Sequence, residues 1–572
     1  MAVTVNLRAQ VREHLGRLYP NVDLDVLTTE VLSAAGIAPA NWDAPVPPAP
    51  KRYGADEAVL ITYGDSLLDG ERHPLAVLTE FVQRHVDDAI STVHVLPFCP
   101  SSSDGGFAVV DYRQVDPSLG AWDDIAGLIG RGGLMADLIL NHGSAQSEWF
   151  AAFLADEAPY RDYYRTSDPG ADLAMVTRPR THSLLHAVDT ASGTRYVWCT
   201  FSYDQVDFDF ENPEVLVEFC SIVDHYVRHG ITRLRLDAVA YVWKREGTTS
   251  IHLAETHELV KLLHTLLAVR EPRALLITET NVPHDQNVSY FGKGDEAHVV
   301  YNFSLVPLVL HTMLAGDSAA LTRWGRALGA LPQGSTYLNF LASHDGLGLR
   351  PAEGLLSPGE IDAIVDAGLA VGGQFSSYAD GAIERPYELN ASLADLLAGP
   401  ALELADRFIA SHAIMVAFAG IPAVYIHSLL ATAGDLAAVK ATNTNRAINR
   451  PRLQLAGIEA DLADAASPRR QIFDQLVGLL QVRRSQPAFD PDAGQEFLDL
   501  GSEVFAVRRT PAEGQAVTAI TNVTNRRVTV DATARGVKGA GRSTEVDLLS
   551  GSTLCGDVVL APWQTVWLVE AE

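Results

Sequence analysis

Eight short runs of apolar residues recur along the chain, and each is followed by a stretch whose apolar residues have helical spacing. The runs occupy residues 57–65, 91–100, 133–142, 231–240, 274–281, 298–305, 336–345 and 420–429. Short strands that are apolar on both faces and alternate with helices are typical of a parallel sheet covered by helices. Eight such units in succession predict a (β/α)8 TIM barrel at residues 51–489.

Two connections in this pattern are much longer than the others. The first, insert B, covers residues 144–210 between the third and fourth strands. The second, insert B′, covers residues 347–405 between the seventh and eighth strands. Long connections in a compact enzyme are usually binding loops or small subdomains, and we expect one of these forms for each insert.

The two ends of the chain depart from the barrel pattern. Residues 1–50 predict a helical extension that runs into the proline-rich linker APVPPAPKR. From residue 490 the pattern changes to short alternating strands, at 504–510, 516–523, 526–532, 543–549 and 565–571. Residues 490–572 therefore predict a separate C-terminal antiparallel β-domain.

Charge and cysteine usage narrow the class of protein. The 572 residues include 43 Lys and Arg against 71 Asp and Glu, a net charge of −28, which argues against nucleic acid or an anionic membrane as a partner. The first 15 residues lack the apolar core of a signal peptide, and the longest apolar run, residues 413–426, is too short to span a bilayer. The 4 cysteines have no metal-ligand spacing, so we expect a reduced, cytoplasmic enzyme without a metal, either a monomer or a homodimer.

Polar residues stand where several of the apolar runs stop. Asp237, Glu279 and Asp345 end the fourth, fifth and seventh runs, Asp65 follows the first, and His142 ends the third. In a barrel such residues meet at the carboxyl ends of the strands, where active sites lie. A single aspartate in this place is usually a helix cap or turn residue. Three carboxylates in barrel order indicate a catalytic site instead.

The fourth run, RLRLD, places Arg233, Arg235 and Asp237 on one face of its strand. Convergent carboxylates suit glycoside chemistry, in which an ionised carboxylate attacks the anomeric carbon and a protonated one donates to the leaving oxygen. Arg235 would keep Asp237 ionised by favouring its charged form. The acid needs a raised pKa, which burial and neighbouring carboxylates would supply.

Four segments, LMADLILNH, RLRLDAVAY, ITETN and FLASHDG, resemble the four short motifs of the α-amylase superfamily, glycoside hydrolase family 13, and the likeness spans residues 55–450. Further segments, among them VLITYGDSLLDG, VWCTFSYDQVDFDFENPEV and NRAINRPRL, resemble the sucrose phosphorylase subfamily. The resemblance implies that Asp237 is the nucleophile, Glu279 the general acid/base and Asp345 the residue that stabilises the transition state.

The resemblance also assigns the glucose subsite. It implies that Asp65 and Arg446 form an ion pair that closes this subsite. His142 and His344 would bind glucose hydroxyls, and Arg235 would orient Asp237. Aromatic residues Phe107 and Tyr63 could pack on the sugar ring or belong to the core.

In the sucrose phosphorylase subfamily, phosphate rather than water attacks the glucosyl-enzyme. The implied reaction converts an α-glucoside and phosphate into α-D-glucose 1-phosphate and a released acceptor, with retention of configuration. Inorganic phosphate is then a substrate, and no cofactor is expected. A hydrolase or transglucosidase on the same barrel is a less favoured alternative. A catalytically inactive binding subunit is disfavoured because all three carboxylates are present.

The inserts carry arginines that bear on the acceptor. Arg178 and Arg180 lie in VTRPRTHSLL of insert B, and Arg385 lies in ERPYELN of insert B′. These segments resemble those of sucrose 6F-phosphate and glucosylglycerate phosphorylases, whose acceptors are anionic, and guanidinium groups bind such anions through two hydrogen bonds. The extra cation favours sucrose 6F-phosphate, with glucosylglycerate or sucrose as the alternative. The arginines could also form solvated ion pairs, and weaker candidates for the pocket are His182, Lys440 and Asn443.

Overall fold

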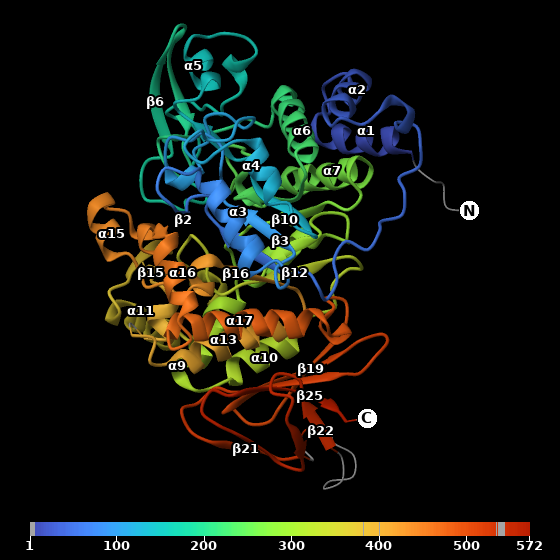
Figure 1. Ribbon diagram of the computed structural model, residues 1–572. Helices are drawn as coiled ribbons and strands as arrows, with labels where there is room; N and C mark the ends of the chain where they lie inside the picture. Colours follow the sequence, from blue (N-terminus) through green and yellow to red (C-terminus); the bar gives the residue numbers. More distant parts are fainter. Residues whose placement is uncertain (1–5, 381–382, 400, 533–534, 536–543, 572) are drawn as a thin grey trace.

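The computed structural model describes residues 6–380, 383–399, 401–532, 535 and 544–571. Eight parallel strands close into a barrel in the order β1-β16-β12-β11-β10-β9-β4-β3, which confirms the predicted fold class (Figure 1). Each strand falls within one of the eight apolar runs. The barrel strands are β1 (Val59–Thr62), β3 (Thr92–Val95), β4 (Gly133–Ile139), β9 (Ile231–Asp237), β10 (Leu275–Thr278), β11 (Val299–Tyr301), β12 (Thr336–Asn339) and β16 (Ile421–Tyr425).

Helices connect these strands and cover the outside of the barrel. Helix α6 shows why they form: Asn212 caps its first turn, Pro213 occupies that turn, and buried Leu216, Phe219 and Val223 recur at helical spacing. The helices of the barrel connections are α3 (Pro74–His85), α4 (Trp122–Gly127), α6 (Pro213–Arg228), α7 (Ala254–Arg270), α8 (His284–Val288), α9 (Leu305–Ala315), α10 (Ala319–Ala327), α13 (Ala405–Ala417), α14 (Ile426–Leu429), α15 (Leu436–Thr442), α16 (Leu455–Ala463) and α17 (Pro468–Arg484).

The register of strand β9 positions its charged residues. Its neighbour β4 pairs Asp137 with Arg235 and Ile139 with Asp237. On the other side, β10 pairs Ile277 with Arg235. Arg235 therefore lies beside Asp137 near the carboxyl ends of the strands, where the chain emerges into the loops of the catalytic face.

Two sets of additional elements stand between barrel strands. Between β4 and β9 lie β5 (His142–Ser144), α5 (Glu148–Leu154), β6 (Leu185–Thr190), β7 (Gly193–Trp198) and β8 (Gln205–Asp207). Between β12 and α13 lie β13 (Leu347–Gly348), α11 (Pro358–Ala370), β14 (Gln374–Asp380), β15 (Ile383–Asn390) and α12 (Leu393–Leu397). In the second set, β15 lies between β13 and β14 in a three-stranded sheet.

The N-terminal segment folds into helices α1 (Leu7–Leu18) and α2 (Leu24–Ala34). In Figure 1 they lie against α6 and α7, the two helices that flank β9 in the sequence. His14 and Arg17 contact the Glu258 carboxylate of α7 at 2.7 and 2.8 Å. The hydroxyl of Tyr19 donates to the carbonyl of Phe210 at 2.9 Å. The extension is thus attached to the barrel beside its catalytic strand.

The C-terminal segment forms a six-stranded antiparallel sheet in the order β18-β19-β20-β25-β22-β23, with β21 and β24 paired beside it (Figure 1). Ser318 of the barrel donates to the carbonyl of Val504 at 2.7 Å, and buried Arg509 donates to the carbonyl of Ala417 at 3.1 Å. These strands are β18 (Gly494–Leu498), β19 (Val504–Thr510), β20 (Val517–Asn522), β21 (Val528–Val530), β22 (Thr544–Asp547), β23 (Thr553–Cys555), β24 (Val558–Leu560) and β25 (Thr565–Glu570). Among the described residues, no helix has the length and apolar character that a membrane span requires.

Candidate active site

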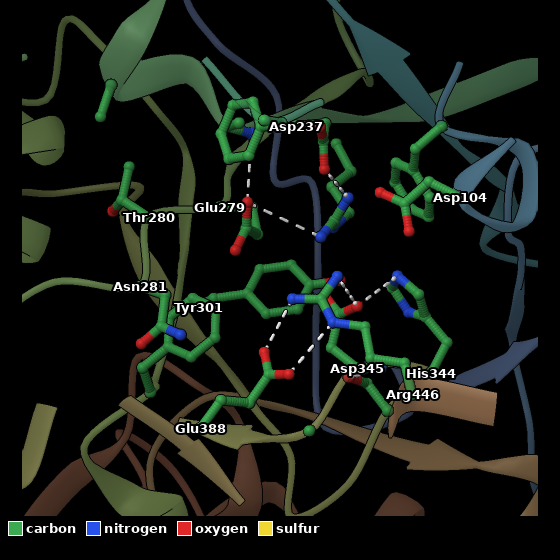
Figure 2. Close-up of a pocket in the computed structure, with 18 of the residues that line it drawn as sticks. Asp104, Asp237, Glu279, Thr280, Asn281, Tyr301, His344, Asp345, Glu388 and Arg446 are labelled. Carbon is green, nitrogen blue, oxygen red and sulfur yellow. Dashed lines mark hydrogen bonds and ion pairs between the residues drawn. The ribbon is translucent and has the colours of Figure 1, made fainter. Parts of the chain in front are cut away.

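A cavity at the carboxyl ends of the barrel strands contains the three predicted carboxylates (Figure 2). Asp237 ends β9, while Glu279 and Asp345 follow β10 and β12. The chain turns sharply after the nucleophile candidate, since Ala238 has a φ of 46°. This turn lets the Ala238 N–H donate to Glu279 Oε2 at 3.1 Å, which ties the two strand ends together.

Arg235 is held between carboxylates in the barrel interior. Its guanidinium donates to Asp137 Oδ1 and, at 2.8 Å, to Asp237 Oδ1. The other oxygen of Asp137 lies 2.9 Å from His94 Nε2. Burial opposes ionisation of Asp137, but Arg235 and His94 outweigh it and lower the Asp137 pKa to about 2. The cation is therefore fixed against an ionised carboxylate and aimed at Asp237.

The two carboxyls proposed to react share one electrostatic environment. Burial raises the pKa of Asp237 and of Glu279, with Arg235 acting in the opposite direction on both. Neighbouring carboxylates add to the increase, so the pair favours a state with a single proton. Arg235 lies 2.8 Å from Asp237 and 3.8 Å from Glu279. The guanidinium thus stabilises ionised Asp237 more strongly and leaves the proton on Glu279.

Asp345 lies in a separate network of cations. Figure 2 shows Arg446 between Asp345 and Glu388. Arg446 Nη1 is 2.6 Å from Asp345 Oδ1, and two more nitrogens contact the Glu388 carboxylate at 3.1 and 2.7 Å. Arg450 adds a contact to Asp345 at 3.4 Å. Burial opposes ionisation of Asp345, but Arg446 and Arg450 outweigh it and lower its pKa, so this carboxylate is ionised.

The predicted ion pair between Asp65 and Arg446 is wrong. Asp65 Oδ2 lies 2.7 Å from Arg452 Nε, and Asp65 does not line the cavity. Arg446 forms ion pairs with Asp345 and Glu388 instead. The first strand ends too early for Asp65 to reach the cavity, because the chain turns away into the short strand β2 (Leu67–Leu68).

Asp104 lines the cavity where Asp65 was expected (Figure 2). It lies in the loop after β3 with a φ of 52°, and Gly105 follows with a φ of 61°. A Cβ at Gly105 would stand 2.4 Å from Arg450 Nη1 and 2.8 Å from the Tyr63 hydroxyl. Only glycine lets this loop approach so closely, and the DGG sequence after the second apolar run was its signal.

His142, His344 and Phe107, the residues predicted near the sugar, all line the cavity. Phe107 stacks on His344 with 5.0 Å between ring centres, and His142 Nε2 lies 3.0 Å from the carbonyl of Phe107. Burial lowers the pKa of His142 to about 4 and holds that of His344 well below its usual value, so both rings are neutral. Tyr63 does not line the cavity and packs beneath Arg450, 5.6 Å from its guanidinium carbon.

Several polar atoms of the cavity wall have no hydrogen-bond partner although they are buried. Among the described residues they include His94 Nδ1, Asn281 Oδ1, Tyr301 Oη and both ring nitrogens of His344. Buried polar groups in native proteins are nearly always hydrogen-bonded, so such a group of exceptions in one cavity indicates a polar ligand. A sugar supplies hydroxyls that both donate and accept, which suits this mixture of atoms.

One of the three predicted acceptor cations faces the cavity. Arg180 lines it, and no hydrogen bond or ion pair joins the Arg180 side chain to another part of the chain that the structure describes. Arg178 lies outside the lining and donates to the carbonyl of His182. Arg385 lies on β15 in a different hollow, beside Glu353 and Pro358.

The weaker acceptor candidates do not line the cavity either. His182 Nε2 is engaged by the carbonyl of Cys199 at 2.9 Å. Lys440 and Asn443 are exposed at the end of α15. The prediction of acceptor contacts from these three residues is therefore wrong for the described geometry.

Besides Asp104, three charged residues around the cavity were not identified from the sequence. Asp137 interrupts the apolar run LMADLI, Glu388 lies in the ERPYELN segment, and Arg450 repeats Arg446 at a spacing of four. Asp137 could have been identified, because a charge inside an apolar strand is unfavourable unless it is paired. The other two had no such signal, since only the folded loops bring Arg450 to Asp345 and Glu388 to Arg446.

Comparison with known proteins agrees with the geometry. The model of the α-amylase catalytic domain matches residues 88–345. The chain is 40% identical to a glucosylglycerate phosphorylase of Allomeiothermus silvanus, covering 100% of both chains, and 39% identical to one of Escherichia coli, covering 91% and 92%. The crystal structure of a sucrose 6F-phosphate phosphorylase from Thermoanaerobacter thermosaccharolyticum matches with a TM-score of 0.72 and 25% identity, over 83% of this chain and 96% of that one. The chain belongs to the α-amylase superfamily, glycoside hydrolase family 13, within its group of glucoside phosphorylases.

Proposed function

We propose that this protein is a retaining glucosylglycerate phosphorylase. It would convert glucosylglycerate and inorganic phosphate reversibly into α-D-glucose 1-phosphate and glycerate. The observation that carries the acceptor assignment is Arg180, a cation of the cavity wall without a partner among the described residues. The high identity to relatives named glucosylglycerate phosphorylases supports the same assignment.

In the first displacement, ionised Asp237 attacks the anomeric carbon while Glu279 gives its proton to the glycosidic oxygen. The bond between glucose and glycerate breaks, and an ester joins glucose to Asp237. Asp345, held by Arg446 and Arg450, would bind the sugar. The positive charge that develops on the sugar ring is stabilised by the ionised carboxylates around it.

In the second displacement, an oxygen of hydrogen phosphate attacks the same carbon and the ester to Asp237 breaks. Glu279, now ionised, accepts the proton of the attacking phosphate. Two inversions give net retention, so the product is the α-anomer of glucose 1-phosphate. No metal or cofactor takes part in this proposal, and phosphate acts only as a substrate.

Arg180 would bind the acceptor carboxylate through its two-pronged guanidinium and then hold phosphate in the second step. The sequence-based preference for sucrose 6F-phosphate rested on three acceptor cations. Because Arg178 and Arg385 lie outside the cavity lining, one cation is available, which suits a carboxylate better than a sugar phosphate. The identity to the sucrose 6F-phosphate phosphorylase is also lower than that to the glucosylglycerate phosphorylases.

The experiment that tests this function measures glucose 1-phosphate released in phosphate buffer from glucosylglycerate, sucrose 6F-phosphate and sucrose, offered separately. We expect the highest kcat/KM for glucosylglycerate. A higher value for sucrose 6F-phosphate would restore the first preference and assign Arg180 to a phosphate ester. Free glucose without glucose 1-phosphate would replace the phosphorylase by a hydrolase with the same nucleophile.

A further inference from the structure

Strand β9 carries a second arginine on the face of Arg235, at the opposite end of the barrel. Arg233 opens onto a hollow of about 870 Å3 at the amino-terminal mouth. This hollow is separate from the catalytic cavity, and the proposed function makes no use of it. Six cations line it, against four carboxylates: Lys51, Arg52, Arg131, Arg233, Arg273 and Arg484, with Asp56, Glu57, Glu271 and Asp490. A local excess of positive charge is unexpected in a chain with a net charge of −28.

Most of these cations lack a carboxylate partner. Lys51 pairs with Asp490 at 2.5 Å, and Arg233 approaches Glu57 at 3.3 Å. For the other four arginines of the hollow, no carboxylate of the described residues lies within ion-pair distance. The hollow therefore contains four guanidinium groups that form no ion pair with the described carboxylates.

Their hydrogen bonds go to backbone carbonyls instead. Arg52 donates to the carbonyl of Pro272 at 3.1 Å, and Arg484 donates to the carbonyl of Asp88. Arg131 donates to the carbonyl of Asp87 in the same way. The side chain of Arg273 makes no hydrogen bond to any residue that the structure describes. Each carbonyl accepts from one nitrogen of a guanidinium group, so the remaining N–H donors of that group can bind a ligand.

Arg233 itself is buried yet loosely held. It is 5% exposed, and its contacts to Glu57 and to the carbonyls of Arg52 and Arg273 are 3.3–3.5 Å long, beyond the usual range for such bonds. Its one hydrogen bond of ordinary length goes to the hydroxyl of the adjacent Thr232, at 3.0 Å. Its Nε is buried without an acceptor. Burial also raises the pKa of Glu57, so this carboxyl is a weak counterion for Arg233.

We propose that the amino-terminal mouth of the barrel binds a small polyanion that carries phosphate groups. The cations come from five segments: the linker before β1, the turns before β4 and β10, the start of β9, and the end of α17. A single carboxylate could reach few of these cations. A ligand with two phosphate groups could bind several guanidinium groups at once. Arg233 would form the floor of this site, and Arg273 and Arg484 would form its rim.

The test uses inorganic pyrophosphate as the probe and isothermal titration calorimetry of the full-length protein at low ionic strength, where screening is weak. The variants are R273Q, R484Q and the double variant R273Q/R484Q. R323Q is the matched control, since Arg323 is exposed and has a single carbonyl contact at 3.4 Å. R180Q removes the cation of the catalytic cavity and reports binding there.

We expect one pyrophosphate to bind, with an affinity that falls roughly ten-fold or more in the double variant, because charge-assisted hydrogen bonds are lost. R323Q and R180Q should keep the wild-type affinity. The double variant should retain wild-type turnover of glucosylglycerate, which shows that it is folded. R273Q alone should also remain folded, because the Arg273 side chain makes no hydrogen bond to a described residue. Absence of binding to the wild type at millimolar pyrophosphate would overturn the proposal, and so would binding that R180Q abolishes and the double variant leaves intact.

Discussion

Arg233 and Arg235 are two arginines on one face of one strand, yet they have opposite surroundings. Arg235 contacts Asp137 and Asp237, and its second nitrogen lies 3.8 Å from Glu279. Arg233 has one carboxylate, Glu57, at 3.3 Å. The cation at the carboxyl end of the barrel thus stabilises the ionised states of Asp137 and Asp237, whereas the cation at the amino end has a single, more distant carboxylate. Strand direction, and not residue type, decides between these two outcomes.

The largest expected effect is at the carboxyl end. Asp237→Asn removes the attacking carboxylate, so glucose 1-phosphate formation should fall about 10⁵-fold, as for other enzymes that lose a nucleophile. Steady-state kinetics with glucosylglycerate and phosphate measure the loss. Asp499→Asn is the control, because the side chain of Asp499 is 73% exposed and far from the cavity. Activity within ten-fold of the wild type would show that Asp237 is not the nucleophile.

The next largest effect is a difference in the free energy of unfolding between variants of Arg235 and Arg233. Arg235→Met leaves Asp137 and Asp237 buried without their shared cation and should reduce the free energy of unfolding by about 3–5 kcal/mol. Arg233→Met removes one long ion pair and three hydrogen bonds to uncharged oxygens, and Glu57, whose pKa is raised, can take up a proton, so the loss should be smaller, about 1–2 kcal/mol. Urea unfolding of both variants measures the difference. Equal losses would mean that Arg233 and Arg235 contribute equally to the free energy of unfolding.

The two ends should also respond to acid in opposite directions. The folded-state pKa of Asp137 is lowered to about 2, so the stability it contributes is present at neutral pH and is lost as the pH falls through about 4 towards 2. The size of this loss is on the order of 2 kcal/mol. Glu57 has a raised pKa, so its ionisation destabilises the fold as the pH rises through that value.

The measurement for this prediction is urea unfolding between pH 5 and pH 3, compared among the wild type, Asp137→Asn and Glu57→Gln. Asp137→Asn should show a shallower loss of stability on acidification than the wild type. Glu57→Gln should show a steeper one, because it no longer gains from protonation. Parallel curves for all three proteins would contradict the assignment of these shifts.

The smallest expected effect concerns the acceptor. Arg180→Gln should raise the KM for glucosylglycerate roughly ten-fold with little change in kcat, because it removes one charge-assisted contact to the acceptor. Arg385→Gln is the matched control on the other insert and should change KM less than two-fold, since Arg385 lies outside the cavity lining. Equal effects of the two substitutions on KM would indicate that Arg385 also contacts the acceptor.

The sequence predicted the barrel and the three carboxylates of its cavity because both follow from local pattern. Apolar runs of strand length fix the eight strands, and a charge at the end of such a run must lie at one mouth of the barrel. Asp237, Glu279 and Asp345 could therefore be placed from the sequence. Asp65 followed the same rule and was misplaced, because the rule says where a strand ends and not where the next loop goes.

Partners on distant loops were decided by tertiary structure alone. Asp104 reaches the cavity because Gly105 allows its loop to pass close to Arg450, and Glu388 meets Arg446 only after β15 folds back over the barrel. Which insert arginine lines the cavity was likewise open in the sequence, since Arg178 and Arg180 are only two residues apart. The sequence by itself thus determined the strands and the carboxylates at their ends, because periodic burial is a local property. The tertiary structure decided the ion pairs and which insert arginine lines the cavity, because long-range approach of loops depends on packing that no short segment encodes.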